Sequence, residues 1–313
     1  MRLVLRLVVL LVLLGGGLVA FDRFLPAQAA DLGLRAERAQ SQLEEKRLKI
    51  DGFDIAYLEG GQGEPLVLVH GIGADKDNFT RVARWLTPYY RVIAIDLPGF
   101  GESGKPGDAD YGIPAQAERL DQIMQALNLS RAHFGGSSMG GWIIATYAAK
   151  YPNKVGSLWL LGAAGTDGGK PTEVRKAWER GEYLLFAKTP EEFERTIDFV
   201  FVKRPFLPYS VRQVMAQQAI GNYELHTRIF GDLMKNWSDY SVNAKIRGLP
   251  VPALIVFGDQ DRAVDPGDGI IWQSLLPQSQ LEMMQDIGHL PMAEAPQVVA
   301  QRYLAFRKSL PRS

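Results

Sequence analysis

The sequence predicts an α/β protein: a mostly parallel central sheet flanked by helices, with a helical cap inserted between two of its strands. Short apolar runs of four or five residues recur at 66–69, 92–95, 158–161 and 253–257, and helix-like stretches separate most of them. Strands of a parallel sheet are buried on both faces, so they read as continuous apolar runs rather than alternating ones. The stretch 166–247 breaks this rhythm and contains no convincing buried strand, which indicates the insertion.

Residues 1–30 are predicted to lie outside this fold, as a signal-anchor or signal segment. Arg2 and Arg6 precede the apolar run Leu7–Phe21, which with its flanks approaches the ~20 residues that span a bilayer. Basic residues before the run favour a cytoplasmic N-terminus. Ala27-Gln28-Ala29 supports a competing interpretation, a cleaved signal peptide. We therefore expect the remaining chain either to be anchored on the non-cytoplasmic side of a membrane, periplasmic or extracellular, or to be secreted.

A connecting amphipathic helix is predicted over residues 31–48, because leucines and alanines recur there among charged residues. Asp51-Gly52 then separates two strand-like segments, which is typical of a two-residue hairpin turn. We expect the core of the fold to comprise 49–165 and 248–313.

The remaining elements of the core follow from local patterns. A strand at 132–134 leads into two glycines, and a helix is expected from there to about Ala149. A helix is also expected over 114–128, and a last strand over 281–284. The cap, 166–247, reads as several helices that are punctuated by prolines and rich in aromatic residues. These aromatics predict an apolar pocket, although packing against the sheet would account for part of them.

Composition excludes several classes of function. Lysine plus arginine and aspartate plus glutamate both number 35, so a nucleic-acid partner is not expected. The absence of cysteine excludes disulfides, thiolate metal sites and cysteine nucleophiles. We expect no metal and no cofactor, since the four histidines lie far apart in the sequence: His70, His133, His226 and His289.

The glycine-rich loop Gly99–Gly104 resembles two nucleotide-binding motifs without meeting the requirements of either. A dinucleotide site needs a helix that opens inside the motif, whereas Lys105-Pro106-Gly107 continues the loop. A phosphate-binding loop needs a hydroxyl residue where Pro106 stands. A tight turn after a strand is the favoured interpretation.

Gly136-Ser137-Ser138-Met139-Gly140 fits the pattern G-x-S-x-G, with Ser138 as the candidate nucleophile. The pattern carries weight here because it joins a predicted strand to a predicted helix. A nucleophile in this context sits on a sharp, strained turn, and the glycines leave room for the neighbouring strand and helix.

A serine hydroxyl needs a base, and the base needs an acid that orients it. His289 is the preferred base because it lies just past the last predicted strand, where α/β sheets place ligand-facing residues. His226, in the cap, is the alternative. The acid is expected in the turn after strand 253–257, where three residues compete: Asp259, Asp261 and Asp265.

Two backbone N–H groups are expected to bind the negative oxygen of the transition state. Met139, directly after the candidate nucleophile, should supply one. Ile72, in the loop after strand 66–69, should supply the other. His70 is expected to shape this loop by hydrogen bonds rather than to act as a base.

Together these motifs resemble the α/β-hydrolase superfamily over nearly all of residues 50–310. The matching segments are His70-Gly71, Asp96-Leu97-Pro98-Gly99-Phe100-Gly101-Glu102-Ser103, Gly136-Ser137-Ser138-Met139-Gly140-Gly141, Gly258-Asp259-Gln260-Asp261 and Gly288-His289. The resemblance implies the order serine, acid, histidine, and it selects Asp261 as the acid, with Asp259 as the alternative. Ser138 argues against haloalkane dehalogenases and epoxide hydrolases, which carry aspartate there.

At a finer level the chain resembles membrane-anchored monoacylglycerol lipases and related bacterial lipases. The apolar N-terminus, Gly73–Phe79 and Thr189–Glu192 carry this resemblance. It implies a serine carboxylic ester hydrolase that acts on lipid-derived esters, either like a monoacylglycerol lipase or as a general lipase or esterase. Alternatives are a carbon–carbon bond (diketone) hydrolase or a perhydrolase on the same scaffold, and, in a different class, a non-catalytic ligand receptor.

Overall fold

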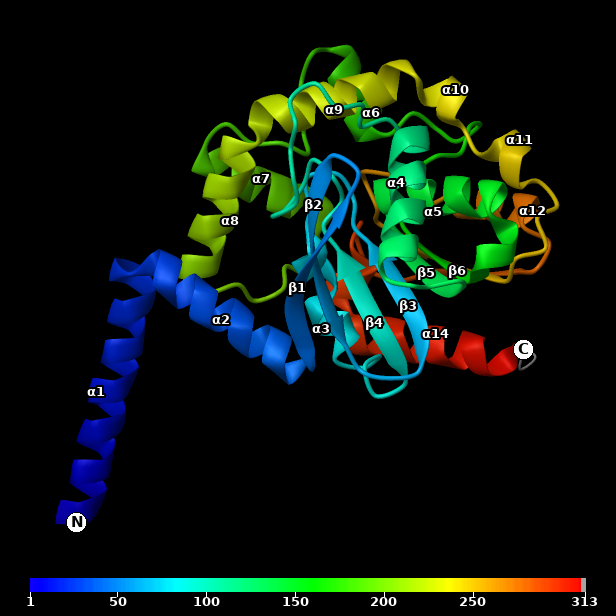
Figure 1. Cartoon of the computed structure of the whole chain (residues 1–313). Coiled ribbons are helices and arrows are strands. Elements are labelled where there is room, and N and C mark those ends of the chain that lie inside the picture. The colour runs from blue at the N-terminus through cyan, green and yellow to red at the C-terminus, as the bar shows by residue number, and fades with distance from the viewer. Residues whose placement is uncertain (311–313) are drawn as a thin grey trace.

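The computed structural model describes residues 1–310 and contains an eight-stranded sheet in the order β1-β2-β4-β3-β5-β6-β7-β8 (Figure 1). Strands β4, β3, β5, β6, β7 and β8 are parallel, whereas β1 and β2 are joined antiparallel at one edge. The strands are β1 (Leu43–Ile50), β2 (Phe53–Gly60), β3 (Glu64–Val69), β4 (Tyr90–Ile95), β5 (Ala132–Ser137), β6 (Val155–Leu161), β7 (Ala253–Gly258) and β8 (Ser279–Met284). The predicted fold class is confirmed, and each predicted apolar run is a strand.

Different helices cover the two faces of the sheet. Along β3, Val67 and Val69 pack on one face, while Leu66 and Leu68 pack on the other. Both faces are therefore buried, which explains the continuous apolar runs. The first face is covered by α4 (Ile113–Ala126), α5 (Met139–Lys150) and α12 (Asp268–Leu275). The second is covered by η1 (Lys76–Phe79), α3 (Thr80–Ala83), α13 (Pro291–Glu294) and α14 (Pro296–Ser309).

Between β6 and β7 the chain forms helices and no strand within the described residues, and these helices arch over one end of the sheet (Figure 1). They are α6 (Glu173–Glu179), α7 (Pro190–Val200), α8 (Tyr209–Gly221), α9 (Tyr223–Lys235), α10 (Trp237–Tyr240) and α11 (Asn243–Ile246). The backbone N–H of His289, in the loop after β8, donates to Val200 O at the end of α7 (2.9 Å). The cap therefore lies at the carboxyl end of the sheet.

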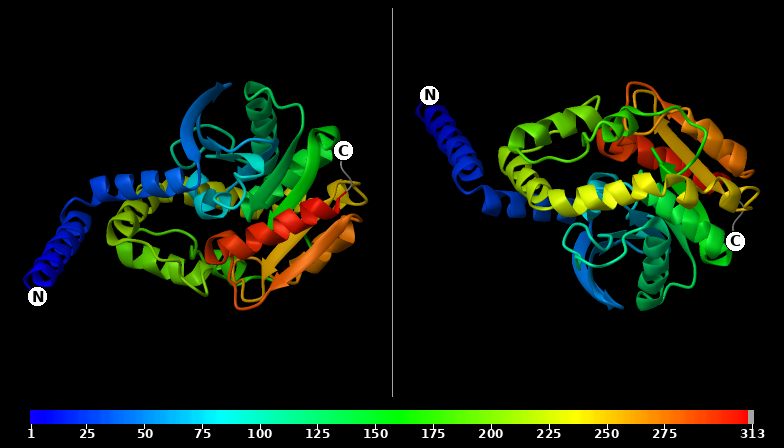
Figure 2. Two further views of the ribbon diagram at one scale, coloured as in Figure 1. Left: turned by 90° about the horizontal axis from the view of Figure 1, so that it is seen from below. Right: turned by 90° about the horizontal axis from the view of Figure 1, so that it is seen from above.

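The N-terminal part forms two helices, α1 (Arg2–Phe24) and α2 (Pro26–Gln40), and α1 projects away from the body (Figure 2). The helix predicted over 31–48 ends at Gln40 instead, and residues 43–50 are strand β1. The leucine, glutamate, lysine and arginine residues there favour a helix, but pairing with β2 across the Asp51-Gly52 turn overrides that preference. The hairpin itself is as predicted.

The second helix, α2, is more than a connector, because it packs against cap helix α8 and buries Ala30. Asp22, at the end of α1, accepts a hydrogen bond from Ser210 N–H (3.1 Å). Arg38 donates to both carboxylate oxygens of Asp77 in η1 (2.8 and 2.5 Å). This helix therefore joins the cap to the core.

The predicted membrane segment is only partly described. Side chains at residues 3, 5, 8, 9 and 11–14 lie outside the description. Among the residues that were searched, no helix combines the length and the apolarity that a membrane crossing requires.

Candidate active site

Ser138 lies on the turn between β5 and α5. Its φ is +53°, a region that residues with side chains rarely adopt. Its N–H donates to Leu161 O (3.0 Å), and its carbonyl accepts from the N–H groups of Trp142 (3.3 Å) and Ala164 (3.1 Å). Strain of this kind persists only where the surrounding structure holds it, and it concentrates at functional sites.

The glycines around Ser138 are required by close packing. A Cβ at Gly136 would lie 2.5 Å from the Gly140 carbonyl oxygen. A Cβ at Gly140 would collide with the carbonyl oxygen of Val69 in β3. The turn therefore fits between the strand and the helix only because these side chains are absent.

Asp261 and His289 meet at the carboxyl ends of two adjacent strands, β7 and β8. His289 Nδ1 lies 2.8 Å from Asp261 Oδ2. Oδ1 of the same carboxylate accepts the N–H groups of Ala263 (2.8 Å) and Val264 (3.0 Å). Both side chains are buried. The carboxylate is thus fixed in orientation, and it holds the proton of His289 on Nδ1, which leaves Nε2 as the nitrogen that can accept a proton.

The end of β6 brings Ser138 next to this pair. Leu161 O accepts the Ser138 N–H, and Gly162 follows directly. A Cβ at Gly162 would lie 3.1 Å from Asp261 Oδ2 and 3.2 Å from His289 Nδ1. The serine, the histidine and the acid therefore all lie next to Leu161 and Gly162, at the carboxyl end of β6.

The other acids that the sequence left open have different surroundings. Asp259 is exposed, and Asp265 accepts a hydrogen bond from Gly267 N–H (2.7 Å) in a local turn. Neither is a partner of His289 within the described residues. The structure thus distinguishes Asp261 from its neighbours by contact, a criterion that composition and spacing could not provide.

The two alternative histidines have structural contacts. His226 stacks on Phe100 with ring centroids 4.7 Å apart, and its Nε2 lies 3.2 Å from Gly99 O. Burial lowers the pKa of His226 to about 4, so it remains neutral. His70 Nε2 accepts from Leu97 N–H (3.0 Å), and Nδ1 donates to Gly71 O (2.7 Å). As predicted, His70 shapes the loop after β3.

Ile72 and Met139 both line the same pocket as Ser138. Met139 is the first residue of α5, so its N–H has no acceptor within the helix. The loop that carries Ile72 lies against the serine, because a Cβ at Gly71 would be 3.0 Å from Ser138 Cβ. Both backbone segments therefore lie beside Ser138, and their role as the two N–H donors for an oxyanion stays a prediction.

The glycine-rich loop Gly99–Gly104 wraps around the buried carboxylate of Asp96. A Cβ at Gly101 would collide with that carboxylate, and Glu102 N–H donates to Asp96 Oδ2 (2.8 Å). Lys76 is also buried and pairs with Asp96 at 3.0 Å. The next helix, α4, begins only at Ile113. The loop is a turn built on an ion pair, as the sequence interpretation favoured.

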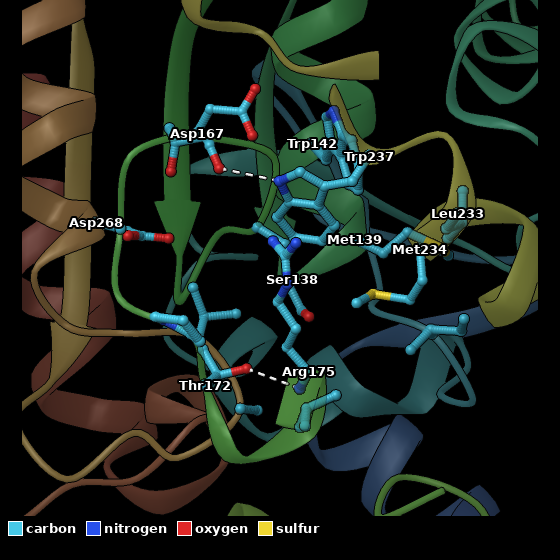
Figure 3. A pocket seen from close by; sticks show the side chains of 18 of the residues that line it. Ser138, Met139, Trp142, Asp167, Thr172, Arg175, Leu233, Met234, Trp237 and Asp268 are labelled. Carbon is cyan, nitrogen blue, oxygen red and sulfur yellow. Dashed lines mark hydrogen bonds between the residues drawn. The ribbon is translucent and has the colours of Figure 1, made fainter. Parts of the chain in front are cut away.

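A pocket of about 850 Å³, including its open mouth, lies above Ser138 (Figure 3). One side is apolar and comes from α5 and the cap helices: Trp142, Phe230, Leu233, Met234 and Trp237. The other side is polar and comes from the loop after β6, from α6 and from the start of α12: Thr166, Asp167, Lys170, Thr172, Arg175 and Asp268. The pocket can therefore accept a molecule with one apolar and one polar end.

Asp268 is a buried titratable group of this pocket that the sequence analysis did not identify. Burial raises its pKa to about 6, and the negative charges of Asp265, Asp261 and Asp167 add to that shift. Its position on the first turn of a short helix gives no sequence signal for a functional site, because acidic residues are common in the first turn of helices. The grouping of histidine, aspartate and glutamate side chains that would hold a metal ion is not found in residues 1–310.

Comparison with known proteins agrees with this geometry. Residues 64–296 match the α/β hydrolase fold family. The chain is 44% identical to Lipase 1 of Psychrobacter immobilis over 88% of each chain. It is 27% identical to the mouse (Mus musculus) monoacylglycerol lipase ABHD6 over 82% of this chain and 81% of that protein.

Among solved structures, the chain is similar to that of a membrane phospholipase A described as a bacterial virulence factor. The TM-score is 0.88 at 38% sequence identity, over 98% of each chain. The family match covers well over half of the sequence, and the relatives span most of its length. The chain therefore belongs to the α/β-hydrolase fold family, in which it is a serine ester hydrolase.

Proposed function

We propose that this protein hydrolyses carboxylic esters of lipids, with Ser138 as nucleophile, His289 as general base and Asp261 as the acid that orients it. The hydrogen bond between His289 and Asp261, at the same carboxyl end of the sheet as Ser138, is the observation that carries the proposal. A base held in one tautomer beside a strained serine is the arrangement that acyl transfer requires.

The reaction follows from these positions. Ser138 Oγ attacks the ester carbonyl while its proton passes to His289 Nε2, and Asp261 stabilises the imidazolium. The N–H groups of Ile72 and Met139 bind the oxyanion, and the alcohol leaves with the proton of His289. Water, activated by His289, then attacks the acyl-enzyme, and the acid is released with Ser138 restored.

A lipid-derived acyl group is supported by the apolar side of the pocket. Trp142, Leu233, Met234 and Trp237 present aromatic and aliphatic surface on that side (Figure 3). The relatives are named as lipases, which is in keeping with this chemistry. A monoacylglycerol or a similarly small lipid ester is therefore the proposed substrate.

The test uses purified protein, the Ser138→Ala variant and p-nitrophenyl esters from acetate to palmitate, together with a monoacylglycerol in detergent. We expect Ser138→Ala to lose at least ~10³-fold in kcat/KM and to escape labelling by a fluorophosphonate probe. If the variant keeps more than about a hundredth of the activity, Ser138 is not the nucleophile. If folded wild-type protein cleaves no ester, a carbon–carbon bond hydrolase or a receptor replaces the proposal.

We further propose that residues 1–24 hold the domain at the non-cytoplasmic side of a membrane. The apolar run after Arg2 and Arg6 supports this, as does the full-length similarity to a protein described as a membrane phospholipase. Flotation with phosphatidylethanolamine and phosphatidylglycerol vesicles tests it. The full chain should float and a chain that begins at residue 25 should not. A mature protein whose sequence starts after Ala29 would instead identify a cleaved signal.

A further inference from the structure

The last turn of cap helix α7 rests on the two loops that carry the candidate acid and the candidate base. The final carbonyl groups of a helix have no partner inside it. Here they are bound from outside, because Arg262, the residue after the candidate acid, donates to Asp198 O (2.5 Å) and Phe199 O (2.9 Å). The N–H of His289 donates to Val200 O (2.9 Å). The loops of the acid and the base therefore cap this helix together.

A single carboxylate joins the same helix end to the loop of the base. Glu294 is the last residue of α13, which follows His289 directly in the fold. Its Oε1 accepts the N–H of Gly288 (2.8 Å). Its Oε2 accepts the N–H groups of Val202 (3.2 Å) and Lys203 (2.9 Å), just past α7. Three hydrogen bonds to one charged group thus link the core to the cap.

The backbone just before His289 is tightly enclosed by these two partners. A Cβ at Gly288 would lie 2.7 Å from Val200 O and 2.8 Å from Glu294 Oε1, which is too close for a side chain. The ring of His289 is held separately, at Nδ1, by Asp261 (2.8 Å). A ring that is fixed at Nδ1 also needs a fixed backbone if its Nε2 is to point in one direction.

We propose that Glu294 is a positioning residue for the general base. It ties the loop of His289 to the end of α7, so that Nε2 of the imidazole stays within reach of Ser138 Oγ. This inference rests on the proposed function. Within residues 1–310, the lining of the pocket above Ser138 does not include Glu294, so this residue acts through His289 and not on the substrate.

The contacts of Glu294 distinguish this role from that of a second acid. Both of its oxygens are occupied by backbone N–H groups, so the carboxylate fixes the backbone and does not orient the imidazole ring directly. Without it, the N–H of Gly288 loses its acceptor and the cap segment after α7 loses its tie to this loop. A displacement of about 1 Å at a reacting group can cost ~10²-fold in rate.

The test compares two esters of butyric acid, p-nitrophenyl butyrate and ethyl butyrate, with the full-length protein. Both esters need His289 to take the proton of Ser138. Only the ethyl ester also needs His289 to give a proton to the leaving alkoxide, because p-nitrophenolate departs as a stable anion. Glu294→Ala should lower kcat/KM about 100-fold on the p-nitrophenyl ester and about tenfold further on the ethyl ester. Glu294→Gln, which keeps one acceptor oxygen, should lie between Glu294→Ala and wild type on both.

The matched control is Glu224→Ala, at an exposed acid of cap helix α9, which should cleave both esters within about threefold of wild type. Circular dichroism at the assay temperature checks that each variant is folded. Equal losses on both esters in folded variants, or losses no larger than those of the control, would overturn the positioning role. If Glu294→Ala does not fold, the ratio of the two esters for Glu294→Gln decides.

The same measurements separate this inference from the proposed function. If wild type cleaves both esters through Ser138 and the ratio stays unchanged in the Glu294 variants, only the positioning role fails. If wild type shows no cleavage that depends on Ser138, the proposed function fails as well.

Discussion

The substitution Asp261→Asn should separate the activity of this protein from its stability. Asn retains an oxygen that can accept the N–H groups of Ala263 and Val264, which Asp261 Oδ1 now holds at 2.8 and 3.0 Å. Its amide NH₂ would face His289 Nδ1 in place of Oδ2. The proton of His289 then moves to Nε2, which can no longer accept the proton of Ser138. We expect kcat/KM to fall about 10⁴-fold with the fold intact.

Asp261→Ala provides the comparison, because it removes both oxygens. Two hydrogen bonds to a charged group, at about 1.5–3 kcal/mol each, give a loss of about 3–6 kcal/mol in the free energy of unfolding. At about 2 °C per kcal/mol this lowers Tm by roughly 6–12 °C. Asp259→Asn, at the exposed neighbouring aspartate, is the matched control and should change neither quantity.

The assay is kcat/KM on a p-nitrophenyl ester together with the Tm from calorimetry, for all three variants. The reasoning is refuted if Asp261→Asn keeps more than about a hundredth of wild-type activity, or if its Tm falls as far as that of Asp261→Ala. In the first case the tautomer of His289 is not what Asp261 controls. In the second, the turn after β7 depends on the negative charge rather than on the two accepted hydrogen bonds.

Three further predictions concern the surroundings of the site. Gly140→Ala should abolish activity, because its Cβ would collide with a carbonyl oxygen of β3, whereas Gly221→Ala, with open space around it, should keep full activity in the same ester assay. Burial raises the pKa of Asp268 from 3.8 to about 6, so the folded state binds this proton more tightly than the unfolded chain. Stability should therefore fall as pH rises from about 4 to 6, and Asp268→Asn, compared with wild type by denaturant unfolding, should lessen this fall and gain up to about 3 kcal/mol at pH 7. Arg38→Ala should lower the free energy of unfolding by about 1–3 kcal/mol, because Asp77 would lose a partner that donates two hydrogen bonds; a change in unfolding midpoint no larger than that of an exposed arginine would contradict this.

The sheet could be predicted because its strands are buried on both faces and so carry a strong local signal. Strand β1 lacks that signal, since its outer residues are charged and only its pairing with β2 makes it a strand. Helices α12 and α14 were not predicted, because their apolar residues are interrupted by polar and exposed positions. Each is defined by what it covers: Trp272 of α12 and Tyr303 of α14 are fully buried against opposite faces of the sheet.

Those residues of the candidate site that follow a predicted strand could be predicted from the sequence. Ser138 stands directly after strand β5, and His289 lies in the loop that follows β8, so the pattern of strands locates both residues. The choice among Asp259, Asp261 and Asp265 depends on which carboxylate turns inward. That is set by the N–H groups of Ala263 and Val264, which donate to Asp261. Asp268 has no pattern at all, because only the folding of the loop after β6 onto α12 makes its carboxyl part of the pocket.

The catalytic residues and the polar side of the pocket differ in which part of the protein holds them in place. The strained φ of Ser138 is held by hydrogen bonds to Leu161, Trp142 and Ala164, all of which belong to β6, to α5 or to the residues just after β6. The position of Ser138 therefore depends on the packing of the core. The polar side depends on a glycine-containing loop that is held to the cap through Trp237. Substitutions in that loop can thus change the polar side of the pocket while the positions of Ser138, His289 and Asp261 stay the same.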